Sequence, residues 1–284
     1  MLNYFLYELR KRRGATIGWG IGLALYVLYV IMLYPSIGAQ YAQIDLDSAL
    51  FQAFIGSDLA SMATFAGFYA IYVPSYLPLL LAVYAILNGS GTLAGEEEEG
   101  TLELFLTLPL ARWQMVLAKA LALSLALLVI LLVTALGTYL TFVAYQSELN
   151  SDVSAMDLVI NVLYGWPLVM VFAMMSMFLS AYLPRRRMAA MFMSLFLIVS
   201  FLGNNLAAIA EPLQKVQPIF PFYYFNGSEV LASGVDMGDL LVLLGTSLFF
   251  YGLAQFSFQR RDVTVGAWPW QRARNKAATQ AAGR

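Results

Sequence analysis

The sequence contains neither cysteine nor histidine among its 284 residues. Without cysteine, the chain can form no disulfide and offers no thiolate nucleophile. Without histidine, imidazole metal sites, histidine general bases and Ser-His-Asp triads are excluded. We therefore expect no metal site, no catalytic residue and no cofactor bound by this chain.

Charged residues are also scarce. They make up 12% of the chain, hydrophobic residues make up 61%, and the mean hydropathy is +0.71. Soluble domains carry about 25% charged residues. The composition therefore predicts an all-α, polytopic membrane protein, with a single transmembrane domain over residues 1–284. The net charge of −1 gives no indication of nucleic-acid binding, and we expect none.

The sequence has no GxxxxGK[ST] phosphate-binding loop, so this chain is not expected to bind ATP. Its long apolar stretches also lack the ionisable residues that proton- or voltage-driven transporters usually need. If the protein moves a substrate uphill, the energy enters from outside the membrane. A core without charge disfavours inorganic ions and favours a hydrophobic or amphipathic substrate, such as a drug, a lipid or a lipid-linked molecule.

Six stretches without charge predict six transmembrane helices, because about 20 apolar residues cross the hydrocarbon core. These stretches are 14–44, 59–95, 120–147, 158–184, 188–210 and 240–259. With the N-terminus inside, fifteen of the sixteen Lys and Arg residues lie on the cytoplasmic side, and Lys215 is the exception. We expect a multi-pass protein of a prokaryotic plasma membrane, with both termini in the cytoplasm.

The two ends of the chain carry distinct patterns. Residues 1–13 predict an amphipathic interfacial helix, with one apolar face formed by Leu2, Phe5, Leu6 and Leu9. A plain basic flank that sets the topology is the alternative. The six-span bundle is expected over 14–261, and the polar, basic residues 262–284 are expected to form a cytoplasmic tail.

Three glycines, Gly14, Gly18 and Gly22, recur every four residues at the start of the first predicted span. Small residues at this spacing permit close helix approach in membranes. We expect them to pack against another helix of the same subunit, or else to lie at an interface between subunits.

Residues 95–119, GEEEEGTLELFLTLPLARWQMVLAK, stand between the second and third predicted spans. The four acids Glu96–Glu99 are predicted to open a helix, where the helix dipole favours negative charge. Leu102, Phe105, Leu106 and Leu108 would form one apolar face of this helix, and Pro109 would end it. The pattern predicts a short amphipathic cytoplasmic helix; an ordinary solvated loop helix is the alternative.

This stretch resembles the signature of ABC-2-type transporter permeases. The matching residues are Glu96 and Glu98, Gly100 and Thr101, the leucine-rich turn from Leu102 to Leu108, Pro109, Arg112 and Lys119. The resemblance implies that residues 1–13 are an elbow helix and that 96–108 is a coupling helix. A separate ABC ATPase subunit, which holds ATP and Mg, would dock on it.

The resemblance also implies an exporter built from a homodimer or heterodimer of permease subunits within membrane lipids. The expected ATPase-coupling residues are Glu96, Glu97, Glu98, Glu99, Gly100, Thr101, Glu103, Pro109 and Arg112.

Two further clusters are candidates for substrate contact. Seven of the thirteen methionines fall between Met170 and Met193, and methionine adapts to varied apolar partners, although ordinary packing explains it as well. An aromatic cluster follows the fifth span and would form either an interfacial belt or, by the resemblance, an extracellular lid. The candidate substrate-pathway residues are Met170, Met174, Phe222, Tyr223 and Tyr224.

A different class of function stays open. The chain would then be a non-transporting membrane sensor or an assembly scaffold whose outer acids and aromatics bind a protein. A membrane enzyme is a more distant alternative, because no two acids stand out as a general acid–base pair.

Overall fold

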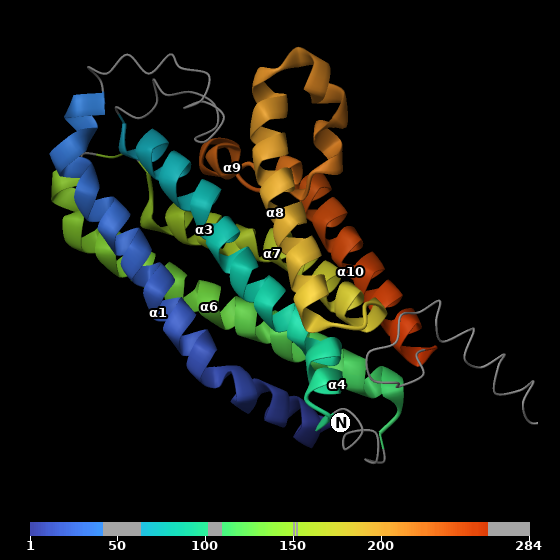
Figure 1. Cartoon of the computed structure of the whole chain (residues 1–284). Helices are drawn as coiled ribbons and strands as arrows, with labels where there is room; N and C mark the ends of the chain where they lie inside the picture. The colour runs from blue at the N-terminus through green and yellow to red at the C-terminus, as the bar shows by residue number, and fades with distance from the viewer. Residues whose placement is uncertain (42–63, 102–109, 150, 152, 261–284) are drawn as a thin grey trace, which may run out of the picture.

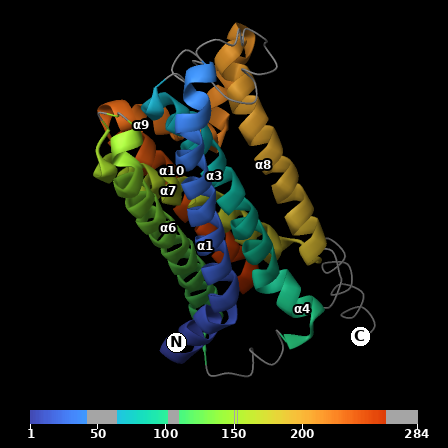
Figure 2. The same cartoon turned by 90° about the vertical axis from the view of Figure 1, so that its left-hand side faces the viewer.

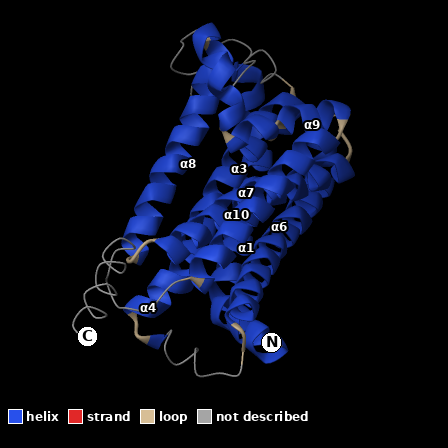
Figure 3. Cartoon of the chain, turned by 90° about the vertical axis from the view of Figure 1, so that its right-hand side faces the viewer, coloured by secondary structure: helices blue, strands red, loops and turns tan. Residues whose placement is uncertain are grey.

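The computed structural model describes residues 1–41, 64–101, 110–149, 151 and 153–260. Within these ranges every regular element is helical and no strand occurs (Figure 3). Six helices are long and apolar enough to cross a membrane. They are α1 (Leu2–Tyr41), α3 (Phe65–Ser90), α6 (Arg112–Leu149), α7 (Ala155–Tyr182), α8 (Arg186–Ile209) and α10 (Met237–Gln259). The predicted all-α class and the six candidate spans are confirmed. The predicted tail, 262–284, lies outside the described residues.

Helix α7 is the centre of the bundle and contacts α3, α6 and α10 (Figure 1). Helix α1 packs along α6 and also contacts α3, and α8 lies at the far side of α3 (Figure 2). The outer faces of these helices carry exposed apolar side chains, among them Ile17, Ile21 and Leu195. A lipid environment suits such faces, because lipid tails are as apolar as the side chains themselves.

Small residues do bring α1 close to another helix, but not at the predicted glycines. A Cβ atom added to Gly137 of α6 would lie 2.7 Å from the Cβ of Ala24, and one added to Gly20 would lie 3.2 Å from Val133. At Gly14, Gly18 and Gly22 an added Cβ would meet no atom of the described residues within 4 Å. The expectation that these three pack within the subunit is therefore wrong, because they point away from α6.

The predicted interfacial segment 1–13 is not a separate helix. It is the first part of α1, which bends near its N-terminus without a break (Figure 1). Thr16 Oγ1 donates a 2.9 Å hydrogen bond to the carbonyl of Arg12, four residues earlier. Such back-bonding often bends helices, so the change of direction needs no second helix.

The four acids also lie differently from the prediction. Helix α3 continues through a π-helix (Gly91–Gly95) into α4 (Glu96–Glu98), so these glutamates close a long helix instead of opening a new one. Gly100, at φ 70°, follows in the left-handed region that glycine adopts without strain. The segment 102–109, which holds most of the predicted coupling helix, lies outside the described residues.

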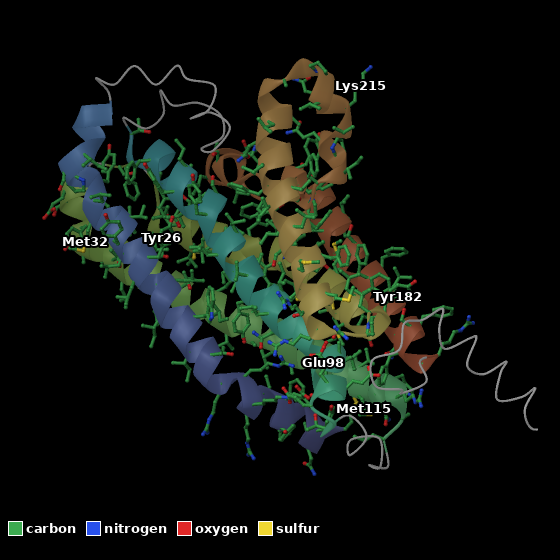
Figure 4. All side chains as sticks on the ribbon, in the orientation of Figure 1. Tyr26, Met32, Glu98, Met115, Tyr182 and Lys215 are labelled. Carbon is green, nitrogen blue, oxygen red and sulfur yellow. The ribbon has the colours of Figure 1, made fainter. Side chains whose placement is uncertain are left out.

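At the opposite end of the bundle, three short helices follow α8: η3 (Glu211–Ile219), η4 (Pro221–Tyr224) and α9 (Gly227–Ser233). The side chain of Phe222 anchors η4, with its ring centre 5.4 Å from that of Phe201 and 5.6 Å from that of Phe172. Figure 4 shows Lys215 at this end, far from Glu98 and Met115 at the other.

Candidate functional site

Four charged side chains from three helices meet inside the end of the bundle that holds the N-terminus. We call them the charge cluster: Glu8 and Arg12 of α1, Glu96 of α4 and Lys119 of α6. Glu8 and Lys119 are fully buried, and Glu96 and Arg12 are 2% and 8% exposed. A buried charge is strongly destabilising unless it is paired, so their contacts decide whether this end of the bundle is stable.

Lys119 is the centre of the charge cluster. Its Nζ lies 2.7 Å from Glu8 Oε1 and 2.6 Å from Glu96 Oε1. Arg12 Nη2 lies 2.9 Å from the second oxygen of Glu8. Two cations and two anions therefore balance, and their ion pairs join α1, α4 and α6.

The local sequence explains why α1 turns charge inward. Glu8 and Arg12 are four residues apart, so they share one helical face with Tyr4 and Thr16, and all four side chains are buried. Leu2 and Leu6 lie on the opposite, exposed face. At a membrane interface this arrangement is stable, because the apolar side chains meet lipid and the charged ones meet each other.

Further hydrogen bonds tie α1 to α3. Arg12 Nη1 donates to Asn88 Oδ1 at 3.2 Å, and the hydroxyls of Thr16 and Tyr84 lie 3.0 Å apart. Lys11 Nζ lies 3.3 Å from Glu96 Oε1, but Lys11 is 44% exposed and belongs to the rim. The last turns of α3 and the first turns of α1 are thus held together beside the charge cluster.

A buried serine on α7, Ser180, supports the π-helix that leads into α4. Ser180 Oγ accepts hydrogen bonds from the backbone N–H groups of Leu93 and Ala94, at 3.1 and 2.9 Å. The same hydroxyl donates to the carbonyl of Ser90 at 2.7 Å. A hydroxyl has one donor and two acceptor positions, so Ser180 uses all of them on this segment.

Replacing Ser180 by alanine should therefore destabilise the protein. Each buried N–H group left without an acceptor costs about 1–3 kcal/mol. We expect a lower melting temperature for the purified variant. The matched control is Ser247→Ala, since Ser247 is also buried but donates only to Leu243 of its own helix. Equal melting temperatures for the two variants would contradict the support role.

The predicted ATPase-coupling residues separate into two groups. Glu96 and Glu97 are buried, whereas Glu98, Glu99 and Gly100 are exposed. Glu98 Oε1 accepts a 3.0 Å hydrogen bond from the backbone N–H of Arg186, at the start of α8, where the helix dipole favours a carboxylate.

The remaining coupling residues are described only in part. Thr101 Oγ1 donates to the carbonyl of Glu96 at 3.2 Å, and Arg112 is half-buried at the first turn of α6. Glu103 and Pro109 lie outside the described residues.

The predicted substrate-pathway residues do not form one site. Met170 and Met174 are buried in the core around α7, and Phe222 is buried in a second cluster with Phe172 and Phe201. Tyr223 is exposed and Tyr224 half-buried. Phe222 and Tyr223 line a cavity of about 320 Å³ near α9 that also contains Asn204, Asn205 and Gln217.

The partners of the buried acids were not predicted from the sequence. Glu8 and Lys119 are 111 residues apart, and nothing local marks them as neighbours. One feature of the sequence did point to a charged face. Glu8 and Arg12 form an i,i+4 pair of opposite charge within residues 1–13, a segment whose prediction depended on its apolar face alone.

Among curated proteins, no sequence matches the chain. A family model described as ABC-2 family transporter protein matches residues 2–263. Because that match covers nearly the whole chain and six of the described helices are long and apolar enough to cross a membrane, the chain belongs to the ABC-2 transporter family, whose members are transmembrane permease subunits distinct from the ATPase.

Proposed function

We propose that this chain is the permease subunit of an ABC exporter that moves a hydrophobic or amphipathic substrate, such as a drug, a lipid or a lipid-linked molecule. Residues 1–284 would form one transmembrane domain. A separate ABC ATPase subunit binds ATP and Mg, and two permease subunits, identical or related, form the membrane part. The family membership supports this proposal.

In this proposal the end of the bundle that holds the N-terminus faces the prokaryotic cytoplasm. Ten of the described Lys and Arg residues lie in helix ends or turns at this end, and Lys215 lies at the other. Cytoplasmic segments carry an excess of Lys and Arg. The exposed acids Glu98 and Glu99 then project where a cytoplasmic ATPase can reach them.

The charge cluster is the observation that carries the proposal. Glu96 stands two residues before Glu98 and is paired with Lys119 of α6, which is paired in turn with Glu8 of α1. A displacement of the segment at Glu98 and Glu99 would therefore pull on α1, α3 and α6 together. Such rigid coupling suits a shift between inward- and outward-facing packings.

Reversing the charge of Glu98 and Glu99 tests the docking surface. The E98K/E99K variant should bind its ATPase about tenfold more weakly, because rim charges set complementarity between partners. Copurification of the ATPase and its stimulated ATP hydrolysis measure the effect. The single variant E99K separates docking from the Glu98 contact with α8.

The matched control is Glu148→Lys, an exposed acid at the opposite end of α6. If E98K/E99K and the control bind the ATPase equally well, these acids have no docking role. A purified complex without any ATPase subunit, together with no substrate movement in vesicles, would favour a sensor or scaffold.

A further inference from the structure

A small recess opens beside the charge cluster, on the side of α3 that lies between α1 and α8. Its volume is about 170 Å³. Three cationic and two anionic side chains line it: Lys11, Arg12, Arg186, Glu96 and Glu99. A cavity with both signs of charge suits a ligand that also carries both.

Two atoms of these lining residues lack partners. Among the described residues, nothing hydrogen-bonds to Arg12 Nε or to Glu96 Oε2, although both side chains are more than nine-tenths buried. Buried polar atoms are nearly always satisfied, so an exception needs an explanation, such as a bound water, ion or ligand group. Arg12 Nε requires an acceptor and Glu96 Oε2 requires a donor, so the missing groups differ in chemistry.

A row of exposed apolar side chains, which we call the apolar track, runs from the recess along α3. Leu80, Val83 and Leu87 of α3 are all exposed and share one helical face, and Leu87 itself lines the recess. They cover about 10 Å along the helix at 1.5 Å per residue. Figure 1 shows this part of α3 with α1 on one side and α8 on the other.

On the side of the track that α1 forms, the residues are small. Ala15 lines the recess, and Gly18 and Gly22 follow it at helical spacing. An added Cβ at either glycine would meet no described atom within 4 Å. The charged recess therefore continues into an apolar track with open space beside it.

We propose that the recess binds the headgroup of a membrane phospholipid that bears both a phosphate and a primary amine, with an acyl chain along α3. The phosphate lies against Lys11, Arg12 and Arg186, as charge-assisted hydrogen bonding favours. The ammonium donates to Glu96 and faces Glu99. This site depends on the chain lying in a membrane, and it does not depend on ATPase coupling or on which leaflet the recess faces.

The chemistry of the recess selects among headgroups. A trimethylated amine has no N–H, so it cannot donate a hydrogen bond to Glu96 or Glu99. A headgroup with a phosphate and no amine pairs with the cations but leaves both carboxylates facing its negative charge. Phosphatidylethanolamine meets both requirements, and phosphatidylcholine and phosphatidylglycerol each fail one.

Lipid binding to the purified full-length chain tests the proposal. Native mass spectrometry and melting temperature are measured with phosphatidylethanolamine, phosphatidylcholine or phosphatidylglycerol of the same acyl chains. We expect at least fivefold tighter binding, and the largest rise in melting temperature, with phosphatidylethanolamine. Soluble phosphoethanolamine should bind more weakly than the lipid, because it lacks the acyl chain.

The K11Q/E99Q variant should weaken the preference, because it removes one of the three cations and one of the two anions that line the recess. Its matched control is K215Q/E148Q, at the opposite end of the bundle. Equal binding of the three lipids by the unchanged chain overturns the proposal. So does a preference that is unchanged in K11Q/E99Q, or soluble phosphoethanolamine that binds as tightly as the lipid. These experiments do not measure ATP hydrolysis. A negative result would therefore contradict the lipid site without contradicting the proposed ATPase-docking surface.

Discussion

Replacing Lys119 by methionine should lower the stability of the folded subunit by about 3–5 kcal/mol, the usual cost of removing one partner from a buried ion pair. Lys119 is fully buried and pairs with two carboxylates. Without it, Glu8 and Glu96 stay buried with only Arg12 and the half-exposed Lys11 to balance them. Thermal unfolding of the purified subunit in detergent measures the loss.

Two comparisons make this result specific. Lys11→Met removes a cation from the exposed rim of the same site, and an exposed pair contributes about 0–1 kcal/mol, so its effect should be small. The double variant E8Q/K119M removes one of the stranded anions and should recover part of the stability. A melting temperature for Lys119→Met equal to that of Lys11→Met would show that the ion pairs do not hold this end together.

Replacing Gly89 by alanine should also lower the stability of the folded subunit, because it disturbs the packing of α3 on α7. The new Cβ would lie 2.8 Å from the Cβ of Ser176 and 2.9 Å from the carbonyl oxygen of Ala173. The second contact is with backbone, so only a separation of α3 from α7 relieves it. Overpacking of this kind costs about 1–3 kcal/mol, which exceeds the gain of about 0.8–1 kcal/mol in helix propensity.

The separation would also stretch the hydrogen bond from Ser176 Oγ to the carbonyl of Ile86, at 3.1 Å. We therefore expect a lower melting temperature for Gly89→Ala. The control is Gly22→Ala, where the added methyl group meets no described atom and helix propensity alone should raise stability. If both alanine variants melt above the parent chain, close packing of α3 on α7 is not required.

The positions of the spans were predictable because they depend on local composition. The stretch 188–210 became Arg186–Ile209, and 240–259 became Met237–Gln259. A helix must satisfy its own backbone hydrogen bonds in lipid, so about 20 apolar residues are enough to place a span. No knowledge of the neighbouring helices is needed for that prediction.

The orientation of each helix face was not predictable in the same way. Gly14, Gly18 and Gly22 carry a packing motif but face away from α6, whereas Gly20 and Gly137 make the close approaches. The glycine spacing indicates only that another helix can pack closely against α1. Which side is approached depends on how the whole of α1 lies on α6.

The sequence by itself determined that this is a six-span helical membrane protein, because composition and hydropathy act locally along the chain. Tertiary structure alone decided that Glu96 is buried against Lys119 and Glu8 while Glu98 and Glu99 remain exposed. The physical reason is that a buried charge needs partners. Those partners come from helices that are distant in sequence and meet only when the bundle packs.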